Sequence, residues 1–283
     1  MKKLSVVLLI VIMTGSIISQ DLPQLRLSGK SDNRSGILKN FENGKSLNTK
    51  SLYNETFQLK KRKTVNSYFG AGYSFIIFTN KYMSEAFPIL DTRSGSFLTN
   101  INLFFGFAIA KAVTLEIEPS IMFTSNTKQV DYQLSKPFVS TTNGNLNYAH
   151  TYTNGLIALP LALNVRFFPF FKLKSYARLF FIGGGVGAAW IREENDIVYN
   201  NSPNTYTIYG TGNEYRSGIT TSQWAPLFKV MAGITGTGGQ FGFGGELRYN
   251  IVPLKQDMTQ PFATRFAKDF NSVDITLRFY FSL

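Results

Sequence analysis

A strict alternation of apolar residues with polar or small ones, repeated in run after run from Val65 onward, is the feature that most constrains this fold. In the stretch 100–110 the odd-numbered residues are all Ile, Leu or Phe, while most even-numbered ones are Asn, Gly or Ala. A period of two indicates a β-strand with one apolar face, and runs of this length can cross a bilayer as tilted strands. We therefore predict an all-β chain of about eight antiparallel strands, at residues 69–77, 100–109, 113–124, 157–167, 179–190, 224–235, 241–251 and 273–283.

The connections between these runs alternate in length. Membrane barrels of the up-and-down type alternate in the same way, with short turns on the periplasmic side and long loops outside. An even number of strands follows, with both ends of the barrel on the periplasmic side. Within the fourth run, Pro160 cannot donate a ladder hydrogen bond and predicts a bulge or a local break in pairing. The short connections lie at 111, 169–174 and 237–239, and the long polar ones at 79–95, 126–151, 192–221 and 253–269.

The beginning of the chain, residues 1–20, has the pattern of a secretory signal peptide, with Lys2 and Lys3 followed by an apolar run and then by small residues. The apolar run is too short for a spanning helix, which needs about 20 residues, and charged or small residues interrupt every later apolar stretch. Residues 21–64 are basic and lack periodicity, which predicts a mostly irregular periplasmic extension. Residues 65–283 are the predicted barrel. The absence of cysteine means that it folds without disulfides.

Two classes of exported protein fit this pattern, a soluble β-sandwich and a β-barrel embedded in lipid. The length of the strands, the signal peptide and the aromatic residues near strand ends favour the barrel, because aromatic girdles mark membrane interfaces. Such a barrel must close, since unpaired strand edges are intolerable in hydrocarbon. The predicted membrane-interface aromatics are Phe107, Phe167, Phe168, Phe170, Phe171, Tyr176, Trp190, Trp224, Phe279 and Phe281.

The second face of the strands carries charged residues mixed with Asn, Thr, Ser and Gly. A ring of eight strands leaves an interior that side chains fill, so a wide pore is not expected. Charges of both signs in that interior should pair, because an unpaired buried charge is costly. We predict a salt-bridge network in the lumen that joins Glu116, Glu118, Glu246 and Asp274 with Arg166, Lys229, Arg248 and Arg278.

On these patterns, residues 65–283 resemble the small outer-membrane β-barrel families, namely the OmpA-like and OmpX-like barrels and the porin-family barrels of the Bacteroidota type. The resemblance implies a transmembrane up-and-down barrel in the outer membrane of a Gram-negative bacterium, inserted by the barrel-assembly machinery. Many substrates of that machinery end in an aromatic residue, whereas this chain ends in Leu283. The segments that carry the resemblance are 113–119 (VTLEIEP), 157–163 (IALPLAL), 183–187 (GGGVG), 246–249 (ELRY) and the aromatic strand 274–283.

Catalytic chemistry finds little support in the sequence. The single histidine, His150, is followed by Thr and Tyr and lacks the His-x-Ser spacing of lipid A deacylases, so we interpret it as an ordinary loop histidine. Glu116 and Glu118 could be glycosidase carboxylates, but basic residues share their face, which favours ion pairing. The glycines at 183–187 lead into a strand, whereas a phosphate cradle needs a following helix.

Metal and cofactor sites have no better basis. One histidine and no cysteine cannot make a transition-metal site without several carboxylates. We predict no enzymatic activity, no cofactor and no metal site. The acids of the third long connection show no calcium-ligand spacing; they are Glu193, Glu194, Asp196 and Glu214.

Three functions remain at this stage. We favour a structural or interaction role in envelope integrity, adhesion or support of a secretion apparatus, exerted through external loops rich in Tyr, Asn, Thr and Ser. The formal net charge of +12 suits outer-membrane lipid and lipopolysaccharide as partners, a protein partner is open, and export excludes nucleic acid. The alternatives are a narrow channel for small solutes and a lipid A-modifying enzyme.

Overall fold

The computed structural model describes residues 67–93, 95–173, 175–203, 212–237 and 240–283. The chain divides into two compact units, Met1–Leu59 and Lys60–Leu283, and the first lies wholly outside the described residues. The predicted signal peptide and the basic extension, 1–20 and 21–64, therefore also lie outside them. The described part belongs to the second unit and begins with a strand at Ser67.

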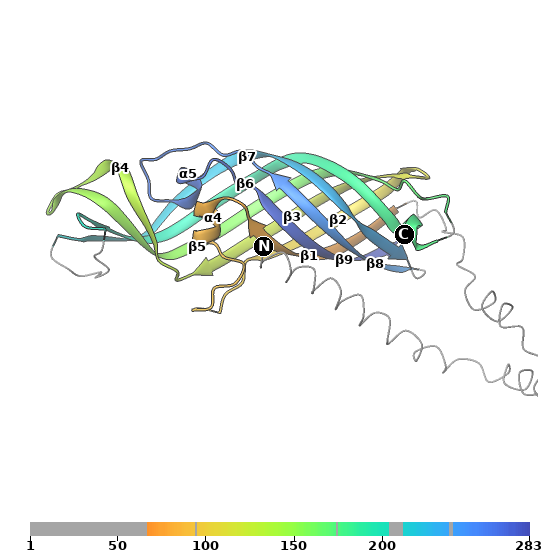
Figure 1. Ribbon diagram of the computed structural model, residues 1–283, viewed down its shortest axis with the longest axis horizontal. Coiled ribbons are helices and arrows are strands. Elements are labelled where there is room, and N and C mark those ends of the chain that lie inside the picture. The colour runs from red at the N-terminus through yellow and green to blue at the C-terminus, as the bar shows by residue number, and fades with distance from the viewer. Residues whose placement is uncertain (1–66, 94, 174, 204–211, 238–239) are drawn as a thin grey trace, which may run out of the picture. The chain divides into compact units, whose positions relative to one another are not determined.

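Nine antiparallel strands in the described part form one sheet (Figure 1). Helices are few and short: α4 (Lys81–Ala86), α5 (Ala263–Phe266) and the 3-10 helix η2 (Tyr176–Leu179). None of the described helices is long and apolar enough to cross a membrane. The strands are β1 (Ser67–Phe78), β2 (Thr99–Ala110), β3 (Val113–Asn126), β4 (Val130–Ser140), β5 (Gly144–Phe167), β6 (Phe180–Asn200), β7 (Glu214–Thr237), β8 (Phe241–Ile251) and β9 (Ser272–Ser282).

The sheet closes into a ring, because β1 pairs with β9 and β3 pairs with β5. Among the named strands β4 pairs only with β5, so the other eight of the nine strands make the barrel wall. The predicted fold, an up-and-down barrel of about eight antiparallel strands, is confirmed. The predicted break at Pro160 occurs in the β3–β5 ladder, where pairing lapses between Pro119 and Met122 without a shift of register.

The connection 126–151, expected as a polar loop, is instead the hairpin of β4 with the outer part of β5. That expectation was wrong because β5 continues beyond the barrel wall and β4 pairs with it. Val130 and Tyr132 pair with Thr151 and Ala149 of β5, and both are buried, as is Leu134. β6 and β7 also continue, into the expected loop 192–221. We call this outer four-stranded extension the protruding sheet; it consists of β4, 144–153, 195–200 and 214–219 (Figure 1).

The wall of the barrel is apolar outside and polar or small inside. On β5, Leu159, Leu161 and Leu163 point outward and are 41 to 54% exposed, whereas Ala162 and Asn164 between and beside them are buried. A soluble sandwich would pack its apolar face against a second sheet. Here no second sheet covers it within the described residues, and the apolar face is the outer surface.

Candidate functional site

The inner half of the barrel next to the short turns is filled by charged side chains. All eight residues of the predicted lumen network are buried in the barrel interior and none is more than 6% exposed, although Asp274 lies near the start of β9, close to a long connection. Four carry a negative and four a positive formal charge, so the set is neutral. The alternation of β3, β5, β7, β8 and β9 turns them inward; they are Glu116, Glu118, Arg166, Lys229, Glu246, Arg248, Asp274 and Arg278.

Glu118 is the best-paired acid of this interior. Arg248 approaches it with both terminal nitrogens, Nη1 at 2.7 Å from Oε1 and Nη2 at 2.9 Å from Oε2. Lys229 Nζ donates to Oε1 at 2.9 Å, and Asn164 Nδ2 donates to Oε2 at 3.1 Å. Four donors therefore surround a carboxylate that has no exposed surface.

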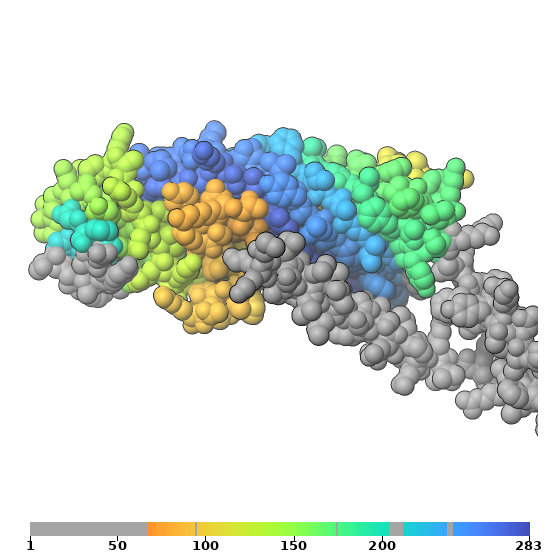
Figure 2. Space-filling model, in the orientation of Figure 1, coloured from red at the N-terminus to blue at the C-terminus, as the bar shows by residue number. Residues whose placement is uncertain are grey.

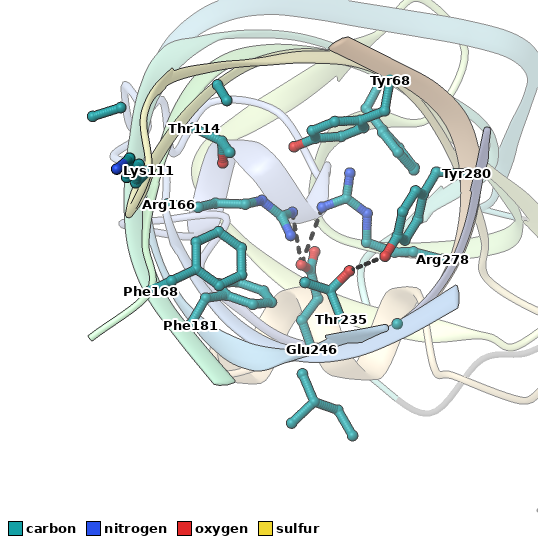
Figure 3. Close-up of a pocket in the computed structure, with 15 residues that line it drawn as sticks. Tyr68, Lys111, Thr114, Arg166, Phe168, Phe181, Thr235, Glu246, Arg278 and Tyr280 are labelled. Atoms are coloured by element: carbon teal, nitrogen blue, oxygen red, sulfur yellow. Dashed lines mark hydrogen bonds and ion pairs between the residues drawn. The ribbon is translucent and has the colours of Figure 1, made fainter. Parts of the chain in front are cut away.

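Glu116 and Glu246 form the second centre, around which two arginines converge; Figure 3 shows Arg166 and Arg278 at Glu246. Arg166 Nη2 lies 3.2 Å from Glu116 and 2.7 Å from Glu246, and Arg278 contacts the same two acids at 2.6 and 3.3 Å. Tyr68 donates its hydroxyl to Glu116 at 3.0 Å. Arg248 also pairs with Glu246, which joins the two centres into one network.

Asp274 is held differently from the other seven charged residues. Its carboxylate accepts hydrogen bonds from Ser272 Oγ and Asn250 Nδ2, both at 2.7 Å, while Arg248 is its cross-strand partner. None of the ion pairs among the described residues includes Asp274, so it lies beside the network without the salt bridge that was predicted for it. Taking charges out of water costs several kcal/mol per ion, which only this density of pairs and hydrogen bonds offsets.

The half of the barrel next to the long loops is filled by apolar side chains, which we call the plug. The connections that carry α4 and α5 fold into the mouth and place Phe87, Leu98, Phe266 and Phe270 against inward residues of the wall. Tyr132 of β4 stacks on Phe266 with ring centroids 4.7 Å apart, which ties the plug to the protruding sheet.

A buried carboxylate fastens the plug to the wall. Glu193 of β6, 1% exposed, accepts hydrogen bonds from the backbone N–H of Thr264, at 3.1 Å, and from its hydroxyl. Burial raises the pKa of Glu193 to about 7, although the hydrogen bonds from Thr264 and the charge of Arg265 oppose this shift. The residue lies beyond Trp190, the last outward apolar position of β6, and next to the outward Arg192.

The plug was not predicted, because the long connections were interpreted as polar loops. A signal was available, since the connections 79–98 and 252–271 carry four buried phenylalanines, far more than loops in water need. Two small cavities border the charged residues of the described interior. One of about 50 Å³ borders Arg166, Arg278 and Tyr68 (Figure 3), and one of about 30 Å³ lies between the network and the plug. Each suits a water or two, since water occupies about 30 Å³ in the liquid.

Most of the predicted interface aromatics point outward. Phe167, Phe170, Tyr176, Phe279 and Phe281 are 41 to 69% exposed at the end with the short turns. Phe107 and Phe171 are partly buried there, and Trp190 pairs across strands with the 69% exposed Trp224 at the other end.

Phe168 departs from this prediction because it is only 2% exposed. The backbone turns inward after β5, where the Phe168 N–H donates to Ala112 O at 2.8 Å. Its ring then packs inside the barrel with Phe181 and Met231, beside the lumen network.

The surface of the protruding sheet is polar and aromatic. Asn145, Asn147, Gln133 and Arg216 are exposed on it, together with Tyr215, which is 40% exposed. His150 lies in this sheet, 1% exposed and in contact with Asp131 of β4 through its Nδ1. In the described part of the chain, no group of three or more His, Cys, Asp or Glu residues could hold a metal ion.

The loop acids considered for calcium have separate protein partners. Glu193 binds the plug, and Glu194 pairs with Arg192 at 3.2 Å on the outer surface. Asp196 accepts hydrogen bonds from Ser217 Oγ and Gly218 N, and Glu214 pairs with Arg216 at 2.8 Å.

No protein-family model and no curated protein matches the chain. Solved structures that align with it include Ail, an outer membrane protein of Yersinia pestis, at 10% identity and a TM-score of 0.35, over 76% of this chain and 94% of Ail. Neisserial surface protein A aligns at 10% identity and a TM-score of 0.33, over 77% and 96% of the two chains. CarO2 of Acinetobacter baumannii aligns at 11% identity and 0.32, over 76% and 98%.

Proposed function

We propose that this chain is an outer-membrane barrel of a Gram-negative bacterium that acts by contact at the cell surface. The observation that carries the proposal is the pairing of a filled interior with an ordered protruding sheet at the same end as the long loops. A barrel whose interior is filled by ion pairs and by an apolar plug has no continuous path for solutes. Its long connections instead contribute to a folded surface, the protruding sheet.

The outer surface of the wall supports a location in lipid. Outward side chains such as Leu103, Phe243 and Leu277 are 43 to 56% exposed, and leaving them in water would cost about 25 cal/mol for each Å² of apolar surface. Lipid removes that cost. The predicted signal peptide and short periplasmic turns agree with the outer membrane as the destination.

The protruding sheet is suited to bind through its faces more than through its free edge. The edge strand β4 is interrupted by a register shift between Gln133 and Phe138, a stretch that includes Lys136 and Pro137. Bulges, lysine and proline on an edge discourage the addition of another strand. Exposed Asn, Gln, Tyr and Arg side chains on the faces can hydrogen-bond saccharide chains of lipopolysaccharide or a polar protein surface.

The two other functions are less well supported. A narrow channel would need both the network and the plug to open. A lipid A-modifying enzyme would need a base that reaches the lipid headgroups, whereas the imidazole of His150 is 1% exposed.

Site-specific photo-crosslinking in intact cells tests the proposal. A photoreactive residue replaces Asn147 or Tyr215 on the protruding sheet, and the control replaces the outward Phe279 at the opposite end of the barrel. We expect adducts with lipopolysaccharide or with one defined envelope protein at the first two positions only. Equal labelling at all three positions, or none, would contradict a binding role for the protruding sheet.

A further inference from the structure

The connection between α4 and β2 forms a short hairpin that projects from the side of the barrel. Asp91 N–H donates to Ser96 O at 2.9 Å, Gly95 N–H donates to Asp91 O at 2.8 Å, and Leu90 bridges Phe97. We call residues 88–98 the lateral hairpin. Its described residues are the orange-yellow bulge below α4 in Figure 2, and the same segment leaves the wall sideways in Figure 1.

Three large apolar side chains of the lateral hairpin are exposed. Ile89, Leu90 and Phe97 are 41, 44 and 59% exposed, whereas Leu98 at the base is 2% exposed and packs into the plug. Exposure of three large apolar side chains to water is unfavourable for a loop whose base is fixed by packing. Contiguous exposed apolar side chains of this kind mark an interaction surface.

The place of the hairpin on the wall indicates what covers it. Phe97 continues the outward alternation of β2, two residues beyond Thr99 and four beyond Ile101. Thr99 pairs with Phe123 of β3, which is outward and 43% exposed, so the apolar outer surface of β3 reaches the level of Thr99. Phe97 therefore lies at the upper border of the surface assigned to lipid.

The polar residues of the hairpin fit the same location. Arg93 is exposed near the tip of the hairpin, where its backbone N–H donates to Asp91 Oδ1 at 3.0 Å. Lys81, which precedes the hairpin, is exposed at the start of α4. A cation beside exposed apolar side chains is the arrangement by which segments settle at a headgroup boundary, with the charge at the phosphates and the apolar groups below.

We propose that the lateral hairpin is a lipid anchor: Ile89, Leu90 and Phe97 enter the headgroup boundary of the membrane, and Arg93 binds an anionic lipid phosphate. The inference rests on the proposed location in a membrane and adds a second contact to that of the barrel wall. The anchor fixes the height and rotation of the plug and of the protruding sheet relative to the bilayer, because Leu98 joins it to the plug.

Fluorescence quenching by brominated lipids tests the anchor. The chain has two tryptophans, Trp190 and Trp224, and their double replacement by Phe leaves a background without tryptophan. Phe97→Trp in that background reports on the hairpin, and the matched control is Val139→Trp, because Val139 is an apolar residue 73% exposed on the protruding sheet. The full chain is folded into phosphatidylcholine and phosphatidylglycerol vesicles, with bromine placed near the headgroup end of the acyl chains.

We expect the Phe97→Trp variant to be quenched about as strongly as the native tryptophans, and the Val139→Trp variant to keep its emission. Adding Arg93→Gln should remove the increase in quenching that phosphatidylglycerol gives over phosphatidylcholine alone. Native Trp190 and Trp224 separate the two possible failures. If they are quenched and the Phe97→Trp variant is not, the anchor is wrong and the barrel stands; if they are not quenched, the membrane location itself is wrong. Heat-modifiable migration on a gel verifies that each variant is folded.

Discussion

The two halves of the barrel interior are filled by opposite chemistry from different parts of the chain. The half next to the short turns holds an ion-pair network whose members all come from strands. The half next to the long loops holds an apolar plug to which the connections around α4 and α5 contribute together with the strands. The network is fixed by the same backbone register that closes the barrel. The connections that contribute to the plug are not members of the strand ladders that close the ring. We infer that the ion-pair network carries most of the stability of the barrel and that the plug is the part that can open locally.

Removing one charge from the network should produce the largest loss of stability. Glu118→Gln removes from a fully buried site the carboxylate that both Arg248 and Lys229 contact, and it leaves Lys229 without its ion-pair partner. Breaking a buried pair costs about 3 to 5 kcal/mol, and we expect the urea unfolding free energy of the barrel in vesicles to fall by that amount. A change below about 1 kcal/mol would mean that the interior is hydrated and the network is not sealed.

A substitution within the plug should leave the pairing of the eight barrel strands intact. Phe266→Ala removes a buried ring that stacks on Tyr132. The free energy needed to open the connection 252–271 locally should fall by roughly 3 kcal/mol, which is at the low end of the losses seen when a buried phenylalanine is replaced by alanine. We expect faster proteolysis of that connection with little change in the unfolding midpoint of the barrel. Equal losses for both readouts would show that plug and wall unfold together.

The two halves should also seal the lumen independently. In planar bilayers, Phe266→Ala alone and Glu118→Gln alone should each show no conductance steps above leak, because the other half stays filled. Only the double variant should conduct. Conductance from the Phe266→Ala variant would show that the network does not close the lumen.

The docking of the plug should depend on pH through Glu193. Its pKa is raised from 4.5 to about 7 by burial, so the protonated form is favoured in the folded protein. The stabilisation is full below pH 4.5 and is lost as pH rises through about 7. Proteolysis of the connection 252–271 should therefore be slower at acidic than at alkaline pH, and Glu193→Gln should remove most of the difference. A loop that opens on acidification instead would contradict this assignment.

The smallest effect should come from an ion pair on the outer surface. Arg192 and Glu194 are 3.2 Å apart, but their side chains are 43 and 56% exposed. Glu194→Gln should change the unfolding free energy by less than about 1 kcal/mol, because exposed pairs contribute little. Glu194→Gln is the matched control for Glu118→Gln. If it lowered the unfolding free energy as much as Glu118→Gln does, buried and exposed ion pairs would not differ in their contribution to stability.

The positions of residues on the strands could be predicted from the sequence, whereas the positions of the plug residues in the long connections could not. A period of two assigns each residue of a strand to one face, which is why the inward positions of Glu116 and Arg248 followed from their neighbours. Phe168 was misplaced because it lies one residue past the end of β5, where the alternation no longer applies. The plug residues Phe87 and Phe270 have no periodic neighbours, so only tertiary contacts fix where they go.

Paramagnetic broadening of methyl signals in a bilayer tests the central claim, a barrel with lipid outside and a sealed interior. A lipid-soluble and a water-soluble probe are compared at neighbouring positions of β5, the outward Leu161 and Leu163 and the inward Ala158 and Ala162. We predict that the lipid-soluble probe broadens the two leucines and that neither probe reaches the two alanines. Broadening of Leu161 or Ala162 by the water-soluble probe would contradict the account.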